Sequence, residues 1–177
     1  MTRKLNELKR WRVSLAERQC KGEYEALMAE YVFKPLGMKR TGFGRPRSKD
    51  RPNEPWLHVK GNQGYAPEPV REGLPDEILA AAGAAHCPIG DFARFASYVL
   101  NAVRGHDALL RPATVQRCRE VLGRERFGDG VDFGGTPWLS AGMMISSGKD
   151  LAIVAAVNGG EAQQACTAAF KIIQERI

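Results

Sequence analysis

The sequence predicts an α+β fold in which helical segments come first, an antiparallel β-hairpin follows, and a C-terminal helix packs on the hairpin. Two observations carry this prediction. Apolar residues recur at helical spacing as far as Leu122, and two short apolar runs joined by turn-forming residues then follow. The composition, 44% hydrophobic and 26% charged over 177 residues, is that of a folded domain and excludes disordered and collagen-like chains.

Each predicted helix is an apolar stripe bounded by residues that start or stop a helix. Charged residues separate the apolar positions within these stripes, which is typical of a helix with one buried face. Proline is favoured in the first turn of a helix and glycine just beyond its end. The predicted helices are residues 1–19, Tyr24 to Val32 with stops at Pro35 and Gly37, Pro88 to Gly105, Pro112 to Gly123, and 161–177.

The predicted hairpin comprises residues 138–146 and 151–157, joined by Ser146-Ser147-Gly148-Lys149-Asp150. Residues 37–85 are rich in Gly, Pro and charge without periodicity, so they are predicted to form a long loop region. No internal repeat divides the chain. Residues 1–177 are therefore expected to form a single domain.

Charge and cysteine spacing exclude several function classes. The net charge of +6 is spread along the chain without aromatic residues interleaved, so nucleic-acid binding is not expected. The four cysteines are far apart and form no zinc-ligand pair, so no metal site is predicted. The four cysteines are predicted to be free thiols in the core. His86 is predicted to be a partly buried side chain that is hydrogen-bonded to the backbone. No apolar run reaches membrane-spanning length.

One serine motif fits either a catalytic site or a turn. Ser146-Ser147-Gly148-Lys149 has the S-x-x-K spacing by which a helix places a lysine amine one turn beyond a serine hydroxyl. Gly148 and the strand-like runs on both sides favour a hairpin turn instead, in which Ser, Gly and Lys are common. We therefore predict that this motif is not catalytic.

Two other segments carry a family resemblance. Residues 30–43, EYVFKPLGMKRTGF, resemble the F-x-P-L-G-M-x-x-T-x-F signature of the class C branch of serine β-lactamases and penicillin-binding proteins. Residues 82–95, AGAAHCPIGDFARF, are similar to the A-G-G-x-x-S-x-x-D-x-A-x-F segment of that family. The resemblance extends from about Glu17 onward and implies the C-terminal part of a β-lactamase/transpeptidase-like fold.

The resemblance also implies where catalytic elements belong. The family's S-x-x-K nucleophile lies well upstream of the P-L-G-M signature, so it is expected to be absent from this chain. Its Y-x-N motif would fall near Lys4-Leu5-Asn6, where only Asn6 matches, and Asn6 is the candidate catalytic residue. The K-T-G or H-x-G motif is replaced by Asp132-Phe133-Gly134-Gly135-Thr136, which lacks the basic residue; Gly134, Gly135 and Thr136 are candidate substrate-binding residues.

The predicted function is that of a β-lactamase-related serine hydrolase homologue that is inactive alone. One alternative is half of an active acyl-transfer enzyme completed by a missing N-terminal segment. Another is a non-catalytic module that binds a partner or a second copy through an apolar sheet edge at residues 138–146. The resemblance implies a β-lactam, peptide or ester-like ligand and no cofactor. The compartment stays open, since the family is usually extracytoplasmic whereas free thiols and the lack of a signal peptide favour the cytoplasm.

Overall fold

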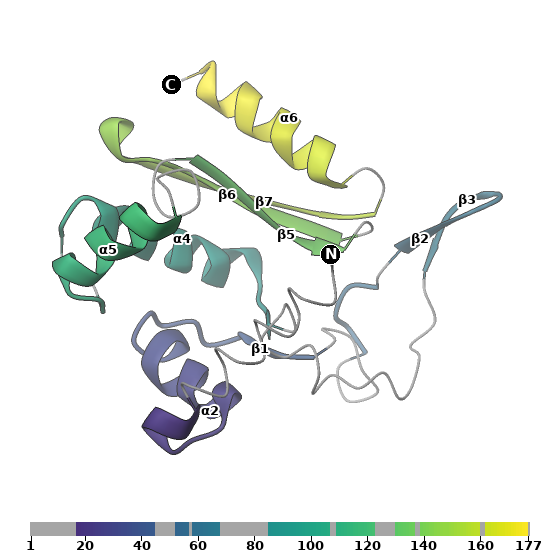
Figure 1. The fold of residues 1–177 in the computed structure, drawn as a ribbon. Helices are drawn as coiled ribbons and strands as arrows, with labels where there is room; N and C mark the ends of the chain where they lie inside the picture. Colours follow the sequence, from purple (N-terminus) through teal and green to yellow (C-terminus); the bar gives the residue numbers. More distant parts are fainter. Residues whose placement is uncertain are drawn as a thin grey trace. The chain divides into compact units, whose positions relative to one another are not determined.

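The computed structural model describes residues 17–44, 52–56, 58–67, 85–106, 109–122, 130–136, 139–159 and 162–176. The chain divides into two compact units. The first comprises Met1–Glu54 and Val70–Pro88, and the second Pro55–Pro69 and Ile89–Ile177. Figure 1 shows the elements of each unit along the chain.

The second unit is built on a three-stranded antiparallel sheet in the order β5-β6-β7. Strand β5 is Gly130–Thr136, β6 is Leu139–Ser146 and β7 is Leu151–Asn158. Thr136 pairs with Leu139, and Ser146 pairs with Leu151, so both connections are tight hairpins. The β6–β7 hairpin confirms the predicted one.

Helices cover both faces of this sheet, as Figure 1 shows. Side chains alternate between the faces along a strand, and on β6 Ile145 packs in a cluster with helix α4 (Ile89–Val103). Its neighbour Met144 packs with Phe170 of helix α6 (Ala162–Gln174). A strand buried on both faces needs apolar residues at every position, which explains why β6 and β7 are almost continuous apolar runs.

Helix α4 ends where the sequence predicts, and its geometry shows why. Gly105 has φ +76°, a left-handed conformation that favours glycine. The N–H of His106 donates to the carbonyl of Asn101, and that of Gly105 to the carbonyl of Ala102. These two bonds form a Schellman cap, which satisfies carbonyls left without partners at the helix end. Helix α5 (Pro112–Leu122) follows and contacts α4.

In the first unit, helix α2 (Tyr24–Met28) continues directly into the π-helical turn η1 (Ala29–Phe33). The sequence predicts a regular helix here, and the wider turn is a difference with a physical cause. Pro35 has no N–H and its ring clashes with the carbonyl four residues earlier, which a regular helix cannot accommodate. The N–H of Lys34 accordingly bonds to the carbonyl of Ala29, five residues back.

The end of this helix explains the P-L-G-M signature in structural terms. Gly37 has φ +66°, and the N–H of Met38 donates to the carbonyl of Phe33 at 2.8 Å. Phe33 and Met38 are both buried, with 7% of the surface of each residue exposed. An apolar contact between these two positions commonly accompanies a Schellman cap. The signature therefore encodes a buried helix end.

Strand β1 (Gly42–Phe43) pairs with β4 (Ala85–His86) in the same unit. The Phe43 ring lies 5.6 Å from that of Phe33 and 5.8 Å from that of Tyr24, centroid to centroid. Ring pairs at such separations add to the energy of burial. These aromatic rings join the helix end to the small sheet.

The 37–85 region predicted as a long loop contains short strands where the structure describes it. Besides β1, and β4 which begins at Ala85, β2 (His58–Gly61) and β3 (Gly64–Pro67) form an antiparallel hairpin. The Asn62-Gln63 turn between two glycines supplies the reversal, a signal that composition alone does not reveal. The expectation of a single domain stays a prediction.

The prediction of four core thiols is wrong for Cys20, which is exposed, whereas Cys166 is buried. The predicted helices after residue 88 are confirmed where the structure describes them. Helices α4, α5 and α6 match the predicted segments, and α6 packs on β6 and β7. The predicted helix at residues 1–19 lies outside the described residues except for its last turn, residues 17–19, which is helical. No helix in the described ranges is long and apolar enough to cross a membrane.

Candidate functional site

The candidate substrate-binding residues lie together on an outer strand of the sheet. Gly134, Gly135 and Thr136 end β5, opposite Ala141, Ser140 and Leu139 of β6. Among the described strands, β5 pairs with β6 alone. Ligand binding at these residues stays a prediction. The register of β5 against β6 fixes where their main-chain groups lie in the sheet.

Helix α6 packs on Ser140, the β6 residue opposite Gly135. Gly135 lies opposite Ser140, which lies opposite Val157 on the other side. Ser140 is buried, and its carbonyl accepts a hydrogen bond from the fully buried Cys166 thiol of α6, with Sγ 3.9 Å from the oxygen. Burial raises the pKa of the Cys166 thiol, so the group stays protonated and acts as a structural donor.

The segment of β5 that stands in place of the family's K-T-G or H-x-G motif begins with Asp132 and Phe133, neither of which is basic. Asp132 pairs with Met143 of β6, two residues before Gly134 in the same strand. A carboxylate cannot support a substrate carboxylate by charge as an ammonium or imidazolium does. Within the described ranges, no three His, Cys, Asp or Glu side chains gather as metal ligands would.

The prediction that residues 138–146 form an open edge of the sheet is wrong. Residues 139–146 form β6, which is the central strand and pairs with β5 on one side and β7 on the other. The sequence did not reveal β5 as a strand because Gly130 and the Gly134-Gly135 pair are poor strand formers in isolation. The outer strands of this sheet are β5 and β7.

The S-x-x-K tetrapeptide forms the turn between β6 and β7, as predicted. Ser146 ends β6, residues 147–149 make one turn of 3₁₀ helix, and Asp150 adopts a left-handed conformation with φ 53°. The Asp150 carboxylate pairs with the Arg104 guanidinium at the end of α4. Lys149 is exposed at this turn, and the segment does not form the α-helix that the catalytic motif requires.

His86 has the structural role that the sequence predicts. Its side chain is partly buried, and Nδ1 lies 3.0 Å from the carbonyl oxygen of Gly44. A Cβ added at Gly42 would lie 3.4 Å from the imidazole ring, so the small residue at that position leaves room for the ring. Asn6, the candidate catalytic residue, lies outside the described residues.

Sequence reasoning missed one polar cluster at the end of β7. The Asn158 amide contacts His58, with Oδ1 3.4 Å from Nδ1, and donates from Nδ2 to the carbonyl of Trp56. These residues are about a hundred positions apart in the sequence, and no local pattern connects them. The Asn158-Gly159 sequence indicated only the end of a strand.

The fold and this sheet are those of a serine β-lactamase-type protein, and the comparisons agree. The β-lactamase family model matches residues 14–174. The chain therefore belongs to the β-lactamase family. Among curated proteins, none matches the sequence.

A solved structure supports the same fold. The chain is similar to the octameric penicillin-binding protein homologue from Pyrococcus abyssi, with a TM-score of 0.66 and 14% sequence identity. The similarity covers 90% of this chain and 39% of that one. This chain thus corresponds to well under half the length of that relative.

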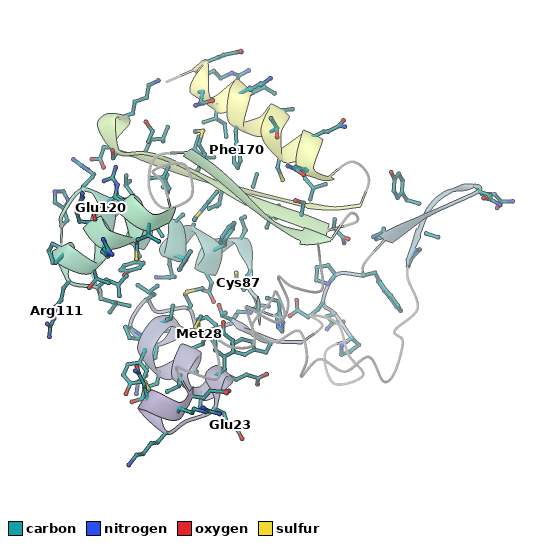
Figure 2. The ribbon with its side chains drawn as sticks, viewed as in Figure 1. Glu23, Met28, Cys87, Arg111, Glu120 and Phe170 are labelled. Carbon is teal, nitrogen blue, oxygen red and sulfur yellow. The ribbon has the colours of Figure 1, made fainter. Side chains whose placement is uncertain are left out.

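Phe170 anchors the terminal helix of this family fold. Figure 2 shows its side chain reaching from α6 toward the sheet, where it packs with Met144 and Ile153. Only 2% of Phe170 is exposed. The sheet that carries the candidate site is held from this side by α6.

Proposed function

We propose that this chain supplies the sheet side of a β-lactamase-type acyl-transfer site and does not turn over substrate by itself. The observation that carries the proposal is the β5 strand, which ends in Gly134-Gly135-Thr136 and holds neither Lys nor His. The only S-x-x-K in the sequence is the hairpin turn at residues 146–149.

The proposed ligand binds along β5 through main-chain hydrogen bonds. In an antiparallel ladder, successive residues turn their N–H and C=O groups toward opposite edges. Gly135 therefore presents these groups to one edge of β5, and Gly134 and Thr136 present theirs to the other. Because glycine has no Cβ, a ligand with an amide, β-lactam or ester carbonyl can approach this strand closely.

Hydrolysis of nitrocefin and of p-nitrophenyl esters tests the lack of turnover. The chain and its Ser146→Ala variant are expected to show the same background rate, since Ser146 lies in a turn and has no helical Lys partner. A rate for the unaltered chain above that of Ser146→Ala would contradict the proposal.

Nuclear magnetic resonance titration with an N-acetylated dipeptide ester tests the proposed binding strand. We expect shifts at β5 backbone amides, and a three- to tenfold weaker Kd in Gly135→Val, equivalent to about 0.6–1.4 kcal/mol. Gly148→Val is the matched control, because a Cβ there meets no atom within 4 Å. Equal affinities in the two variants would contradict binding at β5.

A second form of the proposal is completion by a segment that carries S-x-x-K. It is supported by the share of the Pyrococcus abyssi homologue, 39%, to which this chain corresponds. Mass spectrometry of the native gene product tests it. A native product that matches the 177 residues and binds no second polypeptide would contradict it.

Self-association is a further candidate, favoured by the outer strands of the sheet. Each of β5 and β7 pairs with β6 alone among the described strands, and exposed main-chain groups on such strands can pair with another copy. The similar Pyrococcus abyssi protein is octameric. Light scattering is expected to give a mass that increases with concentration, and a sharp monomer at high concentration would contradict this candidate.

A further inference from the structure

The segment Pro55–Pro69 changes units along the chain. It belongs to the unit of Ile89–Ile177, whereas the chain before it, Met1–Glu54, and the chain after it, Val70–Pro88, belong together to the other unit. The segment therefore leaves one unit, attaches to the other, and returns. We call this segment the strap.

The strap attaches to the end of β7 through the Asn158 side chain. The Asn158 Nδ2 donates to the carbonyl of Trp56, so its Oδ1 is directed to His58 Nδ1, 3.4 Å away. An amide oxygen only accepts hydrogen bonds, so this contact is a hydrogen bond in the tautomer that carries the proton on His58 Nδ1. One amide group thus contacts the strap at two residues.

The next residue allows the strap to approach closely. Gly159 has φ +115°, a conformation that side chains disfavour, and a Cβ there would lie 3.4 Å from the His58 Cβ. His58 therefore packs against Asn158 and Gly159. Residues 61–67 of the strap are exposed. An isolated two-stranded hairpin is marginally stable in water.

The strap attaches at the same end of the sheet as the candidate ligand site. Thr136 of β5 pairs with Leu139 of β6, and Leu139 pairs with Asn158 of β7. These three residues form one row across the sheet. Two strand spacings separate Thr136 from Asn158, which is about 10 Å.

We propose that Asn158 is a positioning residue that latches the strap to the Thr136 end of the sheet, where the strap limits which ligands fit beside β5. The latch itself depends only on the contacts of Asn158. The effect on ligands rests on the proposed function. Loss of the Asn158 amide removes both contacts and frees the hairpin of β2 and β3.

Hydrogen exchange of the full chain tests the latch without any ligand. In Asn158→Ala, the amides of residues 58–67 are expected to exchange about tenfold faster or more, because two hydrogen bonds are lost. Asn101→Ala, an exposed asparagine on α4, is the control. His58→Ala removes only one contact and should give a smaller increase, and it serves if Asn158→Ala does not fold. Unchanged exchange in either strap variant relative to Asn101→Ala would overturn the latch.

Two further measurements separate latching from general stability and from ligand binding. Asn158→Asp keeps an acceptor for His58 and loses the donor to Trp56, so partial protection is expected; protection no better than in Asn158→Ala would contradict the two-contact account. The effect on ligands is measured by the ratio of the Kd of a bulky N-acetylated dipeptide ester to that of a small one. Asn158→Ala is expected to lower this ratio by at least about threefold. An unchanged ratio would overturn the strap's effect on ligands. If neither ester binds the unaltered chain, the proposed function fails while the exchange result still decides the latch.

Discussion

Replacing Phe170 by Ala tests whether α6 holds the sheet. Phe170 is 2% exposed and packs with Met144 of β6 and Ile153 of β7. An aromatic side chain buries about 150–250 Å², and at about 25 cal/mol per Å² this is worth about 4–6 kcal/mol before subtracting what alanine retains. Measured Phe→Ala costs in protein cores are about 3–5 kcal/mol. We expect a loss of about 3–4 kcal/mol.

Urea denaturation followed by circular dichroism measures this loss. The matched control is Ile172→Ala on the same helix, because Ile172 is 52% exposed and its loss should cost less than about 0.5 kcal/mol. Phe170→Leu, expected to cost about 1.5 kcal/mol or less, keeps the test usable if the alanine variant is unfolded. A loss below about 1 kcal/mol in Phe170→Ala, or equal losses at both positions, would refute the packing of α6 on the sheet.

Three further predictions concern a cap, a thiol and a phenol. Gly37→Ala should lower the free energy of unfolding by about 1–2 kcal/mol because of φ +66°, whereas Gly90→Ala, in open space on α4, should not lower it; equal losses would contradict the cap. Iodoacetamide should modify exposed Cys20 readily and Cys166 only on unfolding, since burial also raises the Cys166 pKa; early Cys166 labelling detected by mass spectrometry would contradict its burial. Burial raises the pKa of Tyr98 above 10.0, against the lowering effect of its Leu110 backbone hydrogen bond. The folded state therefore holds this proton more tightly, and its contribution to stability is present below about pH 10 and declines as pH rises further. A urea midpoint that increases as the pH rises above about 10 would contradict this predicted loss of stability.

The sequence predicts the elements whose signals are local. Helix α4 is bounded by a proline before it and by Gly105 after it, and its apolar stripe meets the sheet as expected. The β6–β7 hairpin is also predicted, because two apolar runs flank a turn rich in Ser and Gly. In both cases the residues that predict the element lie within it or directly beside it in the sequence.

The sequence does not predict the elements that depend on distant partners. β5 contains three glycines, so its strand conformation depends on pairing with β6, and without β5 the sequence predicts a sheet edge where the central strand lies. The Asn158 cluster depends on residues about a hundred positions away. The π-turn depends on Pro35, whose effect on the preceding helix is predicted only as a stop.

We propose that this β-lactamase-family chain offers a ligand-binding strand without an acylating serine. Intact-mass spectrometry after incubation with a β-lactam tests this proposal, because an acyl-enzyme retains the whole mass of the opened ring. We expect no covalent mass increase in the chain, and the same spectrum from Ser146→Ala. A stoichiometric adduct that maps to Ser146 or Ser147 and is lost on substitution of that serine would show that this chain is acylated.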